Sequence, residues 1–166
     1  FTLSTRAADV IPNEKIDATQ AGLTDGMVSI RLGDANGKVN DLGWGKPGRF
    51  GLAGSFDGGD DRASIPSTIG DDFTISFWFN TDRIARGTES DPRWFTGSGL
   101  VDGEIPGIVD DFGVSIIAGG VIAAGVGNPE TFVHSVPGFN DGQWHHVAFT
   151  RSKSSGEIIL SIDALE

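Results

Sequence analysis

Residues 73–79 read Phe-Thr-Ile-Ser-Phe-Trp-Phe, a run in which apolar and polar side chains alternate. Successive side chains of a β-strand point to opposite faces, so the three phenylalanines and Ile75 share one face. Trp78 lies on the other face with the two hydroxyl residues. The run therefore predicts a strand whose phenylalanine face packs in a hydrophobic core.

Other segments carry the same pattern and are separated by turn signals. The pair Gly119-Gly120 can take the positive φ angles of a tight hairpin turn between two apolar runs. No window shows a sustained helical repeat of apolar residues. The sequence therefore predicts an all-β, two-sheet antiparallel β-sandwich with little helix. The expected strands, besides 73–79, are residues 51–56, 63–65, 112–117, 121–124, 144–150 and 157–163.

Composition excludes several classes of function. The chain has 166 residues, which suits one domain, and a net charge of −11 from 12 basic and 23 acidic residues. This charge would repel phosphate, so no nucleic acid is expected as a partner. The longest uncharged stretch, residues 112–129, contains five glycines and predicts no membrane insertion. The absence of Cys excludes thiol nucleophiles and thiolate zinc sites.

The ends of the chain differ from its middle. Residues 1–20 are polar and are interpreted as a linker or an edge segment, and residues 21–166 as the sandwich domain. Phe1 in place of Met indicates a processed product or an excised piece. A missing signal peptide therefore carries no weight.

Several of these segments occur in the order found in one known family. Residues 50–61 contain Phe56-Asp57-Gly58-Gly59-Asp60-Asp61, residues 73–79 follow, and residues 141–151 read DGQWHHVAFTR. Over residues 45–163 the chain resembles the laminin G-like, concanavalin A-like jelly roll. The resemblance implies two stacked antiparallel sheets in an extracellular module that binds glycans, proteins or calcium.

The sequence departs from this family after Asp163, where relatives continue with several more strands. The domain is thus expected to be C-terminally incomplete, and three explanations are open. The chain is truncated, or an N-terminal segment takes the place of the missing strands, or two chains form a homodimer through the incomplete sheet edge. A long unpaired edge would otherwise favour aggregation.

Calcium is the cofactor that the resemblance implies. In calcium-binding laminin G-like domains such as those of neurexins, a ligand Asp precedes a strand equivalent to 112–117, and a backbone carbonyl follows the returning strand. The matching positions are Asp111, next to Asp110, and Asn128. Carboxylate and carbonyl oxygens are the donors that calcium prefers. The alternative is a solvated Asp-Asp turn.

Two other groups of polar residues are weaker metal candidates. Asp57, Asp60 and Asp61 do not have the spacing of a calcium loop and suit a tight turn. His145 and His146 are adjacent on a strand and point to opposite faces, so with His134 they do not predict a zinc site.

Catalysis is not expected. Residues 161–166 resemble the Glu-Ile-Asp-x-x-Glu run of glycoside hydrolases with this jelly roll, but Ser161 replaces the first Glu, so the pair of carboxylates is missing. Among aromatic platforms for a glycan, Trp44, Trp78 and Trp94 are candidates, and Trp94 is the one expected near the surface. No sugar site is assigned.

The sequence thus predicts a non-catalytic binding module of a secreted or cell-surface bacterial protein. Its expected partner is a glycan or an extracellular protein, with calcium as the candidate cofactor. The alternatives are a structural spacer or assembly domain without a ligand and, third, a hydrolase.

Overall fold

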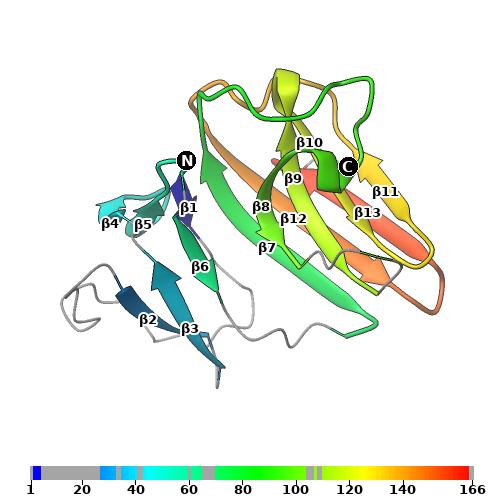
Figure 1. Ribbon diagram of the computed structural model, residues 1–166, viewed down its shortest axis with the longest axis horizontal. Helices are drawn as coiled ribbons and strands as arrows, with labels where there is room; N and C mark the ends of the chain where they lie inside the picture. Colours follow the sequence, from blue (N-terminus) through cyan, green and yellow to red (C-terminus); the bar gives the residue numbers. More distant parts are fainter. Residues whose placement is uncertain are drawn as a thin grey trace. The chain divides into compact units, whose positions relative to one another are not determined.

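The computed structural model describes residues 2–4, 27–32, 35–40, 43–59, 61–64, 70–103, 107 and 110–164. Among these residues the regular structure is β-strand apart from two 3-10 helices of three residues each (Figure 1). No described helix is long and apolar enough to cross a membrane. Two compact units are present. Unit 1 holds β1 to β6 and the middle of β7, Ser76–Phe79, and unit 2 holds the ends of β7 and the described residues from Asn80 onward.

Unit 1 contains two antiparallel groups of strands. The first group consists of β2 (Met27–Leu32), β3 (Ala35–Asn40) and β6 (Arg62–Ser64), with β3 in the centre. The second consists of β1 (Thr2–Ser4), β5 (Leu52–Ser55) and β4 (Gly43–Pro47), with β5 in the centre. A tight turn joins β4 to β5, in which the Gly48 amide donates to the Gly51 carbonyl at 2.9 Å.

At one point in unit 1 the structure departs from the local preference of the sequence. Asn36-Gly37, a pair typical of turns, lies inside β3 and pairs with Arg31 and Ile30 of β2. The pairing of β3 on both sides, with β2 and with β6, overrides the local turn preference.

Unit 2 contains a four-stranded antiparallel sheet in the order β11-β10-β9-β8. The predicted hairpin is confirmed as β9 (Phe112–Ile117) and β10 (Val121–Val126), and both turn glycines have positive φ, 79° and 77°. The short helix η2 (Ala118–Gly120) forms the turn. The outer strands β8 (Ser98–Asp102) and β11 (Thr131–His134) were not predicted.

The second sheet of unit 2 has the order β13-β12-β7. It confirms the predicted strands as β7 (Phe73–Asn80), β12 (Trp144–Ser152) and β13 (Glu157–Ile162). Their alternating residues are buried as expected, with Phe79, Val147 and Phe149 fully covered.

Phe73 connects the two sheets of unit 2. Its ring packs 5.7 Å from that of Phe149 in β12 and 5.4 Å from that of Phe112 in β9, between ring centroids. Phe112 marks the inner face of the four-stranded sheet, which it shares with Val114, Ile116, Ile122 and Ala124 by alternation. The fold is therefore the predicted antiparallel β-sandwich.

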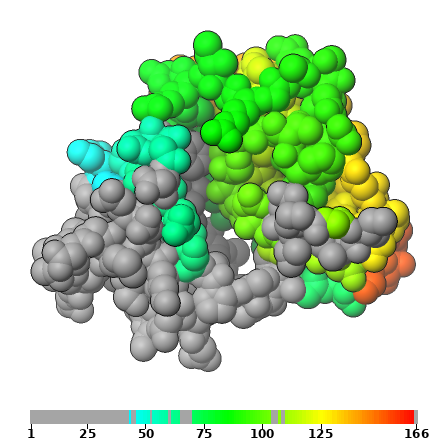
Figure 2. Space-filling model, viewed as in Figure 1, coloured from blue at the N-terminus to red at the C-terminus, as the bar shows by residue number. Residues whose placement is uncertain are grey.

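The opposite face of the four-stranded sheet is also covered. Every residue from Gly113 to Ile117 and from Val121 to Val126 is buried. The cover is η1 (Trp94–Thr96), whose Trp94 packs with Ile117, Val121 and Ala123. The residues that follow β7, coloured green in Figure 2, form a continuous surface along the upper part of unit 2.

Candidate functional site

The predicted calcium ligands lie at the open end of the β9–β10 hairpin. Phe112 pairs with Val126, and the Gly127 amide donates to the Asp111 carbonyl at 2.9 Å. Asp111 is 7% exposed, whereas Asp110 and Asn128 are exposed. The structure thus brings the ends of the two strands together, as the resemblance requires.

The donors at this end are of the kind that calcium prefers, but they supply only part of a shell of six to eight oxygens. In the part of the chain that the structure describes, no group of three or more His, Cys, Asp or Glu side chains is placed to hold a metal ion. Calcium at Asp111, Asp110 and Asn128 stays a prediction.

Asp57 and Asp61 bind backbone amides of their own turn. The Gly59 amide donates to Asp57 Oδ1 at 2.6 Å, and the Asp57 amide donates to Asp61 Oδ2 at 2.8 Å. Asp60 lies outside the described residues. These hydrogen bonds agree with the turn interpretation.

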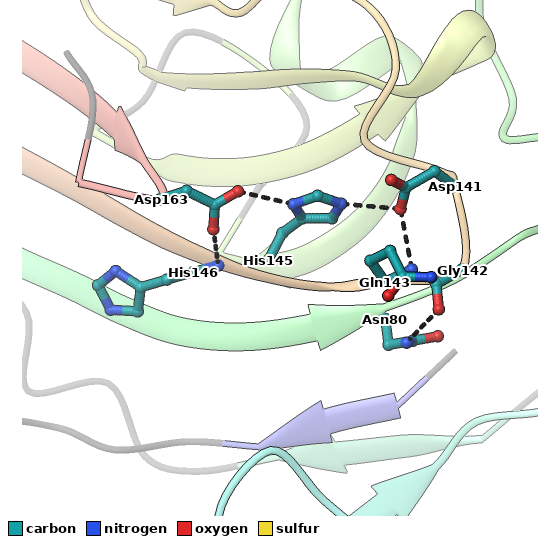
Figure 3. A network of polar contacts seen from close by, with 7 residues as sticks. All are labelled: Asn80, Asp141, Gly142, Gln143, His145, His146 and Asp163. Atoms are coloured by element: carbon teal, nitrogen blue, oxygen red, sulfur yellow. Dashed lines mark hydrogen bonds and ion pairs between the residues drawn. The ribbon is translucent and has the colours of Figure 1, made fainter.

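A charged network surrounds His145 (Figure 3). One ring nitrogen, Nδ1, lies 2.8 Å from Asp163 Oδ2, and the other, Nε2, lies 2.9 Å from Asp141 Oδ1. The ring also packs edge-to-face with Phe139 at 5.1 Å between centroids. Because a carboxylate only accepts, both contacts are satisfied together only when the imidazole carries a proton on each nitrogen.

The pKa values follow from these contacts. Burial lowers the pKa of His145, but the hydrogen bonds to Asp163 and Asp141 together raise it above its ordinary value. The hydrogen bond from His145 holds the pKa of Asp141 below its ordinary value, with help from the Gln143 amide. The imidazolium form of His145 is therefore favoured.

The network joins the ends of three strands. The Asp163 carboxylate also accepts from the His146 amide at 2.9 Å, which ties the end of β13 to the start of β12. Asn80 at the end of β7 donates to the Gly142 carbonyl at 2.7 Å. We call Asp141, His145 and Asp163 the histidine clamp.

Sequence reasoning did not find the histidine clamp. Asp141 lies four residues before His145, a spacing that only loosely indicates contact between a loop and a strand. Asp163 reaches His145 only because the register of β12 and β13 places their ends together. The contact between His145 and Asp163 could therefore be predicted only from that register.

An exposed aromatic cluster lies in unit 1. The Arg49 guanidinium carbon is 4.9 Å from the ring centroid of Phe50 and 5.1 Å from that of Trp78. The two rings meet edge-to-face at 5.7 Å. Phe50 is 52% exposed and Trp78 is half-buried. We call these three residues the Arg49 cluster.

The other two candidate tryptophans do not form such a surface. Trp94 is 5% exposed, so the expectation that it lies near the surface is wrong. Its polar neighbours in sequence form a loop that carries the indole onto the sheet. Trp44 lies in β4, and its side chain is outside what the structure describes.

A family model described as the concanavalin A-like lectin/glucanases superfamily matches residues 57–166. The chain belongs to this superfamily. The matched residues include β6 to β13 and therefore both sheets of unit 2. No curated protein and no solved structure matches the chain.

Concanavalin A-like domains include both binding modules and glycosidases, so membership alone leaves the chemistry open. In this member, Asp163, from the segment that resembles a glycosidase motif, is bound to His145 and to the His146 amide. Ser161 stands where the first carboxylate of that motif would be, and Glu166 lies outside the described residues.

Proposed function

We propose that this domain is a non-catalytic binding module of a secreted or cell-surface bacterial protein and recognises a glycan or an extracellular protein. The superfamily supports a binding role, because many of its members bind carbohydrate or protein. The acidic charge supports the further expectation that nucleic acid is not the ligand.

The observation that carries the proposal is the Arg49 cluster. Its exposed phenylalanine and half-buried tryptophan are fixed by a shared arginine, and a tight turn positions the two exposed residues. Tryptophan and arginine dominate the binding energy of many protein interfaces, and aromatic rings offer apolar area at low entropic cost. Residues 43–56 also carry Lys46 and Arg49 but no acidic residue, which sets this surface apart from an acidic chain.

Calcium is proposed as the cofactor of the same module. Asp111 and Asp110 would hold it through carboxylate oxygens and Asn128 through its backbone carbonyl, with the remaining ligands from water or other carbonyl groups. A cation there would supply a charge that fixes the hairpin end and offers open coordination positions to a polar ligand. We also propose that two chains form a homodimer through a sheet edge. Such a dimer would bind one ligand on each chain.

Binding to an immobilised glycan panel tests the proposal. We expect at least one glycan to be bound by the chain and the signal to fall about tenfold in Arg49→Ala and in Phe50→Ala, because each removes a contact worth about one decade of affinity. Phe132→Ala is the matched control, since Phe132 is also an exposed phenylalanine, with 39% of its surface accessible.

Two results would contradict this assignment. Equal binding by Phe50→Ala and the unchanged chain would remove the Arg49 cluster as the binding surface. A chain that binds no glycan and captures no extracellular protein at millimolar concentration would favour the spacer or assembly domain.

A further inference from the structure

A small pocket lies on the outer face of the four-stranded sheet, between η1, β8 and β9. Its volume is about 30 Å³. The strand register explains its shape, because Gly99 pairs with Ser115 and Asp102 pairs with Gly113. These two cross-strand pairs, each made of one glycine and one polar residue, lie next to each other on this face. Trp94 and Phe95 form the wall above it.

The missing side chain at Gly99 leaves the pocket open. A Cβ atom at Gly113 would collide with the Trp94 indole, so Trp94 fills that corner. A Cβ atom at Gly99 would meet nothing closer than 3.4 Å, the distance to atoms of Asp102. The empty corner at Gly99 is thus bordered by Asp102, and Ser115 Oγ lies beside the neighbouring Gly97, 2.8 Å from where a Cβ atom at Gly97 would lie.

Ser115 supplies the polar group of the pocket. The residue is 2% exposed, and its Oγ is buried without a hydrogen-bond partner among the described residues. A serine hydroxyl both donates and accepts, and a buried polar group without a partner is unfavourable. About 10–15 Å³ is enough for one water, so the pocket holds one small polar group or two waters.

The mouth of the pocket carries a carboxylate and an aromatic ring. Asp102 is exposed, and Phe95 is 40% exposed beside it. Arg93 lies over the Phe95 ring at 4.8 Å and is paired with Asp91 at 2.7 Å. A carboxylate at the mouth accepts hydroxyl donors and repels anions, which favours an uncharged ligand rich in hydroxyl groups.

We propose that this pocket receives a hydroxyl or hydroxymethyl substituent of a neutral saccharide, with Ser115 as its hydrogen-bond partner and Phe95 beside the sugar ring. The inference rests on the glycan-binding half of the proposed function but does not depend on the Arg49 cluster. It assigns a second, separate binding site in unit 2.

Nuclear magnetic resonance of the labelled chain tests the proposal with the methyl glycosides of glucose, galactose and mannose. We expect one of them to shift the backbone amides of Gly97, Gly99 and Ser115 with millimolar affinity. Glucuronic and galacturonic acids, which carry a carboxylate, should shift these amides less. Equal or stronger binding of the acids would contradict the inference that the ligand is a neutral saccharide.

Two variants test the location. Gly99→Ala places a methyl group in the pocket and should abolish the shifts, whereas Gly43→Ala, whose Cβ would have a comparable nearest contact of 3.4 Å, should not. Ser115→Ala should weaken binding about tenfold, the effect of one lost hydrogen bond. Its fold should be intact, because the hydroxyl has no partner within the described residues, and a melt checks this.

The outcomes separate this site from the Arg49 cluster. If Phe50→Ala removes glycan binding while the pocket amides do not respond to any glycoside, the pocket proposal is wrong and the proposed function stands. If Gly99→Ala binds the glycosides as the unchanged chain does, the pocket proposal is also wrong. Loss in Gly99→Ala alone would support it.

Discussion

Trp94 occupies the space that side chains at Gly113 and Gly125 would fill. A Cβ atom at Gly125 would overlap the indole ring and would lie 2.8 Å from the Thr131 carbonyl oxygen. Real Cβ atoms do not approach backbone atoms this closely, so either the indole or the strand would have to move. The two glycines are thus required by close packing, and neither has a positive φ.

We expect Gly125→Ala to lower the free energy of unfolding by about 1–3 kcal/mol, the usual cost of overfilling a packed core. Chemical denaturation measures it. Gly43→Ala is the control, because a Cβ atom there has its nearest contact at 3.4 Å. If Gly125→Ala were as stable as the control, Trp94 would not be seated on these glycines.

The burial of Trp94 could not be predicted from the sequence. Its neighbours Asp91, Pro92 and Arg93 are polar and suggest a surface loop. Two of its partners in the fold are glycines, which carry no apolar signal, and they come from two different strands. Only the pairing of β9 with β10 places them side by side.

At the level of elements, the histidine clamp holds the end of β13 against the start of β12. The two ion pairs form between a loop, a strand start and a strand end. Both depend on charge, since neutral His145 donates from only one nitrogen. Neutral Asp141 would likewise lose its attraction to the imidazolium.

The sign of the pH dependence follows from the pKa directions. His145 has a raised pKa when folded, so its contribution is complete below its unfolded pKa of about 6.5 and is lost as pH rises through the folded pKa. Asp141 has a lowered pKa when folded, so its contribution is present above an unfolded pKa of about 3.9 and is lost as pH falls through the folded pKa. The clamp is strongest between these limits.

We expect His145→Gln to lower the melting temperature most between about pH 4 and pH 6.5, with a smaller difference at higher pH, because the unchanged chain then loses its imidazolium. Melts across this range measure the difference. His134→Gln is the control, since His134 is exposed and contacts a carbonyl oxygen, that of Ser135. A constant difference at all pH values would argue against a protonated clamp.

The strands that sequence reasoning found are those with clear alternation, such as β7 and β12. The strands it missed are β2, β3, β4, β8 and β11. In β8 the register shifts between Gly99 and Val101, which breaks the two-residue period. In β3 the central Asn36-Gly37 resembles a turn. These strands are set by pairing with neighbours, which a local pattern does not contain.

At the level of the whole molecule, the excess of acidic residues favours cations and disfavours anions. A net charge of −11 attracts divalent cations to many carboxylates without specific binding. An experiment on calcium must therefore distinguish binding at one specific site from non-specific attraction to many carboxylates.

A thermal melt with calcium against chelator makes that separation. A site with a dissociation constant one-hundredth of the calcium concentration adds about 2.7 kcal/mol to the free energy of unfolding. We expect a calcium-dependent rise in melting temperature that is absent in Asp111→Asn and present in Asp82→Asn, which removes the same charge from an exposed position elsewhere in the chain. Equal rises in all three chains would indicate general charge attraction.

The doubly covered sheet also constrains how such a domain can diverge. The Trp94 indole fills the space that side chains at Gly113 and Gly125 would need. A lineage can therefore change any of these three residues only together with the others. The β4–β5 turn carries no such restriction, since Arg49 and Phe50 are exposed at its tip. Descendants of this chain are therefore free to change the surface of this turn while the packing around Trp94 stays the same.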